Sequence, residues 1–246
     1  MHWKSKPEQK TLITENTSKQ KTTVDNSKMI ESKLNVKGIL IDLDGTILST
    51  REAYIEAAKT AFTATGQETP DASVALEIPK RIEQKQQISD IVKVEPLKFM
   101  NIYLKTFYAI APSKTMPAPN AADALKKLSE KAKIALITMR RVPKQAILSE
   151  LRQFGLDSYF EYVVTALDTQ EPKPSPEALI QAVRALDVQM CECVIVGDSV
   201  VDVRAGKAAG AKTVAVLSGL YSLAELEKAH PDFIVANIEE LPKIIK

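Results

Sequence analysis

The 246-residue chain is long enough for one large domain, or for one domain with a modest insertion, and either can bury a core. Its net charge of +2, with 33 basic and 31 acidic residues, excludes the strongly basic surface typical of nucleic-acid-binding and membrane-surface proteins. No apolar run approaches the roughly 20 residues needed to span a bilayer, and no signal peptide is recognisable. We therefore expect a cytoplasmic protein without nucleic-acid or membrane partners; the sequence names no protein partner.

The first 35 residues differ in composition from the rest of the chain. Residues 1–35 are rich in Lys, Thr, Ser, Gln and Asn, and no helical or strand periodicity of apolar residues persists across them, which predicts a mobile tail. A docking segment that orders on a partner is the alternative. The only cysteines, Cys191 and Cys193, have no second pair to complete a metal cage, so we expect buried or strand-edge thiols in a reducing cytosol.

A buried strand that ends in a polar loop follows the predicted tail. The three branched apolar residues 39–41 lead directly into the segment Asp-Leu-Asp-Gly-Thr at 42–46. Ligands of open α/β sheets bind just beyond the carboxyl ends of the strands, which places Asp42 and Asp44 for chemistry. The alternative is that both are turn residues ahead of a helix cap.

Residues 49–114 carry helical spacing and no convincing strand. Pro70, Pro79 and Pro96 divide this block into three or four predicted helices. The proline-rich segment 111–119 is a predicted return hinge, since proline stops both helices and central-strand pairing. An all-helical insertion after the first strand suggests a lid over the site.

Helices and strands alternate from residue 120 onward. Gly155 is a predicted helix C-cap, Ser175 and Pro176 a helix start, and Ser222 with Glu225 a capping box. Such alternation predicts an α/β fold with a doubly wound parallel sheet. The predicted strands are 134–138, 162–164, 194–196, 214–216 and 233–235, and the predicted helices are 120–131, 144–154, 175–186, one ending near 210 and one between the last two strands.

Four polar signals fall at the carboxyl ends of predicted strands or in the loops beyond them. They are Asp42 with Asp44, Thr138, Lys173, and Asp198 with Asp202. A turn could supply any one of them, but four at the same edge of one sheet indicate an active site.

These residue types suit phosphoryl transfer. Asp42 can attack phosphorus and form an aspartyl-phosphate, which divides a difficult hydrolysis into two easier displacements. Asp44 can protonate the leaving oxygen and then take a proton from the attacking water. Two carboxylates beside a phosphate dianion repel it and each other, so the site needs cations.

The remaining signals supply those cations and the phosphate contacts. Asp198 and Asp42 can hold Mg²⁺, and Lys173 adds a fixed positive charge. The Thr138 hydroxyl and the N–H groups beside Gly45 and Thr46 can bind the phosphate oxygens. Asp202, one helical turn after Asp198, is either a metal partner or an acid at the helix N-terminus.

These motifs resemble those of the haloacid dehalogenase-like hydrolase superfamily. The segment 42–46 looks like its first motif, Thr138 its second, Lys173 in Lys-Pro-Ser-Pro its third, and 197–202 its fourth. The resemblance covers residues 37–220. It implies a Rossmann-like core, Mg²⁺ dependence with the Asp44 backbone carbonyl among the ligands, and the Asp42 and Asp44 roles given above.

The position of the insertion resembles the small helical cap of the phosphoglycolate phosphatase and β-phosphoglucomutase branch. We accordingly predict a catalytic core at 36–48 and 115–246 and a cap domain at 49–114. The dehalogenases lack an acid at the position of Asp44, so the resemblance argues against carbon–halogen hydrolysis.

Two features depart from the family pattern or add to it. Arg140 follows Thr138 closely, where the family often has a small polar residue, and could add a charge at the mouth of the site; a solvent-facing arginine is the alternative. Lys80 and Arg81 in the cap could meet an anionic substrate, or could be a solvated charge pair.

The sequence favours a Mg²⁺-dependent phosphatase that acts on a small phosphorylated metabolite, such as a phosphoglycolate-like compound or a sugar phosphate. A phosphomutase with the same aspartyl-phosphate is the first alternative, in which a sugar hydroxyl replaces water. The second is a catalytically silent binding module.

Overall fold

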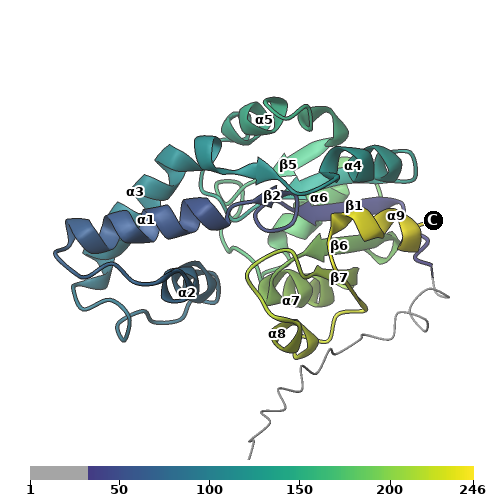
Figure 1. Ribbon diagram of the computed structural model, residues 1–246. Coiled ribbons are helices and arrows are strands. Elements are labelled where there is room, and N and C mark those ends of the chain that lie inside the picture. Colours follow the sequence, from purple (N-terminus) through teal and green to yellow (C-terminus); the bar gives the residue numbers. More distant parts are fainter. Residues whose placement is uncertain (1–32) are drawn as a thin grey trace, which may run out of the picture.

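The computed structural model describes residues 33–246, and its core is a six-stranded parallel sheet (Figure 1). The strand order is β5-β4-β1-β6-β7-β8, and every neighbouring pair is parallel. This arrangement confirms the predicted α/β fold with a parallel, Rossmann-like sheet. The strands are β1 (Gly38–Asp42), β4 (Lys133–Ile137), β5 (Tyr162–Val164), β6 (Cys193–Gly197), β7 (Lys212–Val216) and β8 (Phe233–Val235).

Helices cover both faces of the sheet, which explains why its central strands are continuous apolar runs. On β1, Ile39 and Ile41 face one apolar cluster and Leu40 faces the other, as the alternation along a strand requires. The first cluster includes side chains of α4 (Ala121–Ser129), α5 (Lys144–Arg152) and α9 (Leu241–Ile244), and the second those of α6 (Glu177–Leu186) and α7 (Val200–Ala209).

Three helices are inserted between two short strands that follow β1, and they form a lobe beside the sheet (Figure 1). This lobe has its own apolar cluster, which includes Phe62, Phe99 and Phe107. Two short strands join it to the core, and they pair antiparallel, Leu48 with Pro117 and Ser49 with Met116. The elements are β2 (Leu48–Ser49), α1 (Arg51–Ala64), α2 (Ala72–Glu83), α3 (Pro96–Lys114) and β3 (Met116–Pro117).

The prolines of the insertion do not act as the sequence predicts at every position. Pro79 lies inside α2, and α3 continues through Pro112 to Lys114, so the predicted stop at 111–119 is wrong for the helix. Pro117 even takes part in the pairing of β2 with β3. Both helix prolines lie near a helix C-terminus, where packing of the buried helix face outweighs a local penalty of about 3 kcal/mol.

The chain enters the fold two residues before the predicted boundary of the tail. The Leu34 N–H donates to the Ile244 carbonyl at 2.7 Å, and the Lys246 N–H donates to the Leu34 carbonyl at 2.9 Å. Leu34 is buried and belongs to the core. Residues 1–32, on which most of the predicted tail falls, lie outside the described residues.

Other local predictions hold with small shifts. Helix α6 begins at Glu177 with Pro176 at the N-cap, while Ser175 Oγ accepts a hydrogen bond from the Glu177 N–H at 3.3 Å. Ser222 and Glu225 form the predicted capping box of α8 (Leu223–Glu227). Cys193 is buried and Cys191 is exposed.

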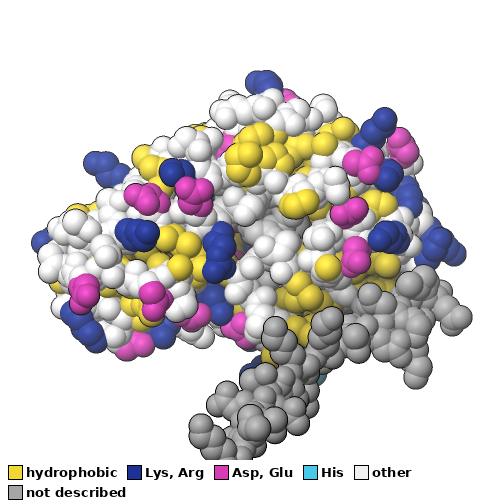
Figure 2. All heavy atoms as spheres, in the orientation of Figure 1, with side chains coloured by type: hydrophobic (Ala, Val, Ile, Leu, Met, Phe, Trp, Pro, Cys, Tyr) yellow, Lys and Arg dark blue, Asp and Glu magenta, His cyan; other side chains and the backbone are white. Residues whose placement is uncertain are grey.

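Basic and acidic side chains are interspersed on the face shown in Figure 2, as the small net charge leads one to expect. Within residues 33–246, no helix combines the length and the apolar composition that crossing a bilayer requires.

Candidate active site

The carboxyl ends of β1, β4 and β6 bring the predicted site residues to one edge of the sheet. Asp42 is the last residue of β1, and its register partner on β4 is Ile137, so Thr138 lies directly beyond that pair. Asp198 follows the last residue of β6, which lies on the other side of β1. The parallel register therefore places residues far apart in the sequence around one point.

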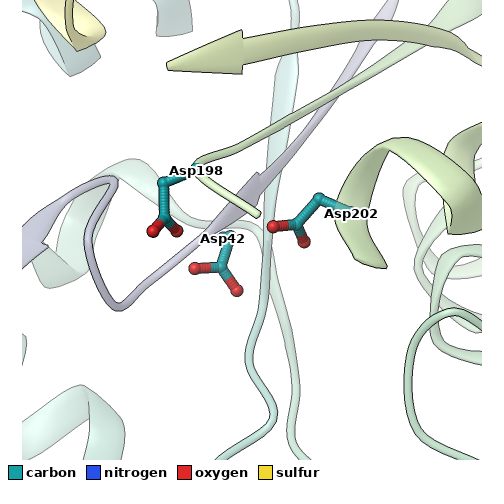
Figure 3. A group of neighbouring side chains, drawn as sticks. All are labelled: Asp42, Asp198 and Asp202. Carbon is teal, nitrogen blue, oxygen red and sulfur yellow. The ribbon is translucent and has the colours of Figure 1, made fainter. Parts of the chain in front are cut away.

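Three buried carboxylates face a common space at this edge (Figure 3). Each of Asp42, Asp198 and Asp202 offers an oxygen, and these oxygens lie within 4.8 Å of one another. Asp42 comes from the end of β1, Asp198 from the loop after β6, and Asp202 from the first turn of α7. Such a set of hard oxygen donors is suited to a divalent cation.

Lys173 ties two of these carboxylates together. Its ammonium lies 2.5 Å from Asp42 Oδ1 and 2.5 Å from Asp202 Oδ1, and the side chain is only 2% exposed. Burial opposes its charge, but the two carboxylates outweigh burial and raise the pKa of Lys173 far above its usual range. The lysine is therefore a fixed positive charge.

Asp202 has a second set of partners, which confirms the alternative that it is an acid at the helix N-terminus. Its Oδ2 accepts hydrogen bonds from Ser199 Oγ at 2.8 Å and from the Ser199 N–H at 3.2 Å, in the capping box of α7. Asp202 thus begins the helix, holds Lys173 and also stands in the three-carboxylate group.

The charges at this point do not balance without a further cation. Three buried carboxylates lie together here, and the ammonium of Lys173 contacts two of them, Asp42 and Asp202. Burial raises the pKa of Asp42 well above its usual range, and the neighbouring carboxylates add to this while Lys173 opposes it. Burial, with Glu83 and Asp202, likewise raises the pKa of Asp198. A divalent cation would neutralise the excess negative charge and reverse these shifts.

The surroundings of Asp198 are shaped closely around its carboxylate. Its Oδ2 accepts from the Leu220 N–H at 3.2 Å, and its Oδ1 accepts from the Thr46 hydroxyl at 3.5 Å. A Cβ at Gly219 would stand 1.7 Å from Asp198 Oδ2, so only glycine fits there. Gly45 is also confined, because its φ of +83° favours glycine and a Cβ would meet the same oxygen at 2.5 Å.

Asp44 forms a buried ion pair with Arg140. The guanidinium donates to both Asp44 oxygens, with Nη2 at 2.6 Å from Oδ1 and Nε at 2.9 Å from Oδ2. Its Nη1 donates to Glu150 Oε2 at 2.5 Å, and Glu150 in turn accepts from the Thr115 hydroxyl at 2.6 Å. Arg140 is 5% exposed, so the solvent-facing alternative for this residue is wrong.

The structure does not bring Lys80 and Arg81 to the other site residues. Lys80 Nζ lies 2.6 Å from Glu225 and 3.2 Å from Glu77, and it is largely buried, so it is not the solvated charge considered above. Arg81 forms an ion pair with Asp90 at the surface of the insertion. Neither residue lines the cavity described next.

A cavity of about 350 Å³ separates the sheet edge from the inserted helices. Its floor includes Asp42, Asp44 and Asp198 from the core. Its opposite wall comes mostly from the insertion and is largely aromatic and aliphatic, with Tyr54, Ile82, Tyr103, Leu104, Phe107 and Tyr108. Its volume is within the range of pockets that enclose small-molecule ligands.

Several residues at this site escaped the sequence analysis. Glu83 and Tyr103 come from the insertion, Glu150 lies on α5, and Tyr221 lies in the loop after β7. The one usable signal was the position of the loop that follows the strand 214–216, since this parallel strand ends at the same sheet edge as Asp42. Helical periodicity alone does not distinguish Glu83 or Glu150 from surface acids.

Comparison with known proteins identifies the family to which this chain belongs. Residues 39–216 match the family described as haloacid dehalogenase-like hydrolase. Because this match spans well over half of the chain, the protein belongs to that family and is a hydrolase. The predicted superfamily is thereby confirmed.

Individual relatives are more distant. The chain is 26% identical to the pyrophosphatase PpaX of Halalkalibacterium halodurans over 227 residues, covering 86% of this chain and 98% of that protein. It is 27% identical to the putative pyrophosphatase PpaX of Clostridium perfringens over 213 residues, with 86% and 98% covered.

Solved structures share the fold. A putative haloacid dehalogenase-like hydrolase from Bacteroides fragilis matches with a TM-score of 0.74 and 22% identity, covering 84% of this chain and 99% of that one. A putative phosphoglycolate phosphatase from Lactobacillus delbrueckii subsp. bulgaricus matches with a TM-score of 0.72 and 22% identity, covering 85% and 98%.

Proposed function

We propose that this protein is a Mg²⁺-dependent phosphatase that hydrolyses a small phosphorylated metabolite through an aspartyl-phosphate on Asp42. One observation carries the proposal: Asp42 lies at the end of a central strand, bound to Lys173 and within reach of Asp198 and Asp202. Family membership and the names of the relatives, which include pyrophosphatases, support the reaction class.

Asp42 is the proposed nucleophile. A carboxylate oxygen of Asp42 attacks phosphorus, the ester P–O bond breaks, and the phosphoryl group is transferred to the protein. Water then attacks the same phosphorus and breaks the new acyl-phosphate bond, which releases phosphate and regenerates Asp42. Lys173 orients the carboxylate and offsets charge on the phosphoryl oxygens.

Asp44 is the proposed acid and base. Protonation of the leaving oxygen requires a carboxylic acid, so we propose that the contact between Asp44 and Arg140 opens when the substrate binds and that Asp44 then takes up a proton from solvent. In the second step the Asp44 carboxylate accepts a proton from the attacking water. Asp44 then releases this proton to solvent, and its carboxylate pairs with Arg140 again.

Asp42, Asp198 and the Asp44 backbone carbonyl are the proposed Mg²⁺ ligands, and Asp202 is proposed as a further partner. The buried hard-oxygen donors and the excess negative charge fit a divalent cation. When bound, Mg²⁺ would neutralise the phosphate dianion beside these carboxylates. The Thr138 hydroxyl and the N–H groups beside Gly45 and Thr46 are proposed to bind the phosphoryl oxygens.

The inserted helices are the proposed cap domain, which excludes bulk water while the phosphoryl group is transferred. Their placement over the cavity and their separate apolar cluster support this role. The boundaries proposed for the cap, 49–114, correspond to the junction formed by β2 and β3.

The test measures phosphate release from a panel of phosphate monoesters and pyrophosphate, with Mg²⁺ and with a chelator. We expect turnover that depends on Mg²⁺ and that Asp42→Asn abolishes while leaving the thermal midpoint of unfolding within a few degrees of the wild type. Isomerisation of a hexose phosphate without phosphate release would indicate the phosphomutase instead. Absence of turnover on the whole panel would contradict both enzymes.

A further inference from the structure

The hydroxyl of Tyr103 stands out on the cavity wall. Among the side chains of residues 33–246, Tyr103 Oη is the one buried polar atom without a hydrogen-bond partner. Tyr103 is 1% exposed and lines the cavity between the inserted helices and the sheet edge. A buried hydroxyl is almost always paired, so an orphaned one in a cavity wall points to a partner supplied by a ligand.

The position of Tyr103 indicates which end of the substrate would supply that partner. Asp44 belongs to the cavity floor and Tyr103 to the wall that the insertion contributes, and burial, followed by the charge of Asp44, raises the pKa of the Tyr103 hydroxyl. Asp44 is the residue proposed to protonate the leaving oxygen. Tyr103 therefore lies on the leaving-group side of the phosphoryl group, and its O–H stays protonated and able to donate.

The walls around Tyr103 favour a flat apolar group. Tyr54 and Phe107, which both line the cavity, stack with their ring centroids 4.8 Å apart, and Phe99, which does not line it, stacks on Tyr103 at 6.3 Å. Leu104 extends this apolar wall along α3. Aromatic walls attract ring-shaped ligands through both area burial and ring–ring geometry.

The same region offers little to a second phosphoryl group. Arg140, the buried cation of the cavity, is paired with both Asp44 and Glu150, and its pair with Glu150 remains when the contact with Asp44 opens. Arg51 and Arg141 also line the cavity, but both are exposed at its rim. Glu83 adds an acid to the wall. A cavity of about 350 Å³ also exceeds what two phosphoryl groups need.

We propose that this cavity is a leaving-group subsite for phosphate monoesters of a ring-bearing, largely apolar alcohol or phenol, and that Tyr103 Oη donates a hydrogen bond to a polar atom on that ring. The inference rests on the proposed phosphatase function and names its substrate class. It makes Tyr103 a specificity-determining residue, and it distinguishes this chain from an enzyme built for pyrophosphate.

The test uses phosphonates, which bind without being hydrolysed, so that it is independent of turnover. Binding of methylphosphonate, benzylphosphonate and the three ring isomers of acetylbenzylphosphonate is measured by calorimetry with Mg²⁺ present. For the wild type we expect benzylphosphonate to bind at least about tenfold more tightly than methylphosphonate. At least one acetyl isomer should bind roughly three- to tenfold more tightly still.

In Tyr103→Phe the acetyl group should no longer increase the binding affinity, while benzylphosphonate should still bind more tightly than methylphosphonate. Because the hydroxyl is unpaired in the free protein, this variant should unfold at the same temperature as the wild type or higher. Tyr159→Phe, a half-buried tyrosine outside the cavity, is the matched control and should behave as the wild type.

Equal affinities for methylphosphonate and benzylphosphonate would overturn the inference. It would also be overturned if the acetyl group increased the affinity as much in Tyr103→Phe as in the wild type. A preference for pyrophosphate over benzylphosphonate would overturn it as well. These outcomes are separate from the failure of the proposed function, which would appear as absence of phosphate release from every substrate by the wild-type enzyme.

Discussion

At the scale of single residues, the buried ion pairs behind the candidate nucleophile do most to fix the site. Lys173 holds Asp42 and Asp202, and Arg140 holds Asp44 and Glu150. Both cations are buried, so each depends on its carboxylates for compensation of its charge. The types of most site residues followed from the sequence, but their pairing did not. Arg140 and Asp44 are 96 residues apart, and only the register of β1 with β4 brings them together.

Glu150 provides a test of this dependence. Glu150→Ala leaves the buried guanidinium of Arg140 with one carboxylate in place of two, and it also removes the partner of Thr115. We expect the free energy of unfolding to fall by about 3 kcal/mol, measured by urea denaturation. The control is Glu161→Ala, an exposed acid, which should change it by less than about 0.5 kcal/mol. Equal effects of the two variants would contradict the role given to Glu150.

Glu83 should make stability depend on pH. Burial, followed by the influence of Asp202, raises the pKa of Glu83 from 4.5 to about 8. Between these values the unfolded chain loses the proton that the folded protein keeps, so Glu83 makes the free energy of unfolding decrease as pH rises. Without divalent ions, we expect Glu83→Gln to weaken this decrease between about pH 5 and pH 8. Parallel pH profiles for wild type and variant, from thermal unfolding, would contradict this.

At the scale of elements, the C-terminal end of α2 contacts the loop that follows β7 and the helix α8 after it. Lys80 pairs with Glu225 at 2.6 Å and lies 5.1 Å from the centre of the Tyr221 ring. The Tyr221 hydroxyl donates to Glu83 Oε2 at 2.9 Å. We call Lys80, Glu83, Tyr221 and Glu225 the α2 latch. The sequence left Lys80 as either a substrate contact or a solvated charge, because a charge on a lid does not reveal its partner 145 residues away.

The α2 latch should hold the cap against the core. Lys80→Met keeps the packing of the aliphatic stem but removes the positive charge that pairs with Glu225. We therefore expect the cap to close less firmly on the core, with KM raised several-fold and a smaller change in kcat. Lys85→Met, which removes an exposed pair with Glu171, is the control and should leave both constants unchanged. A KM equal to that of the wild type in Lys80→Met would contradict the latch.

The latch should also weaken in acid. Burial opposes ionisation of Glu225, but hydrogen bonds from Lys80 and Ser222 outweigh it and lower its pKa to about 2. The stabilisation is therefore complete above about pH 4.5 and is lost as pH falls toward 2. Wild type and Glu225→Gln should accordingly converge in thermal stability over that range. A difference between them that stays constant down to pH 2 would contradict this assignment.

Other elements show how far the sequence carries the fold. The central strands and their helices were predictable because burial on both faces leaves continuous apolar runs between helical periods. The two-residue strands β2 and β3 were not, since a single antiparallel pair has no period. The continuation of α3 through Pro112 was not predictable either, because tertiary packing outweighs the local preference of proline.

At the scale of the whole molecule, the parallel core collects the carboxylates and the inserted helices close a cavity above them. The family follows from the sequence, since its motifs lie at strand ends in a fixed order. The aromatic cavity wall formed by the insertion could not be predicted from the sequence, because its residues have the same helical spacing as any apolar core. Substrate choice therefore depends on the part of the chain whose sequence is least informative.

The most direct test of the account is the detection of a phosphoryl group on Asp42 itself. Wild-type protein is mixed with Mg²⁺ and a phosphate monoester that it hydrolyses, quenched in acid during turnover, and digested for mass spectrometry. We predict that the peptide containing Asp42 carries one phosphoryl group, that hydroxylamine removes it, and that Asp42→Asn shows none. Hydrolysis at full rate with this peptide unmodified, or a phosphoryl group that persists in Asp42→Asn, would contradict the account.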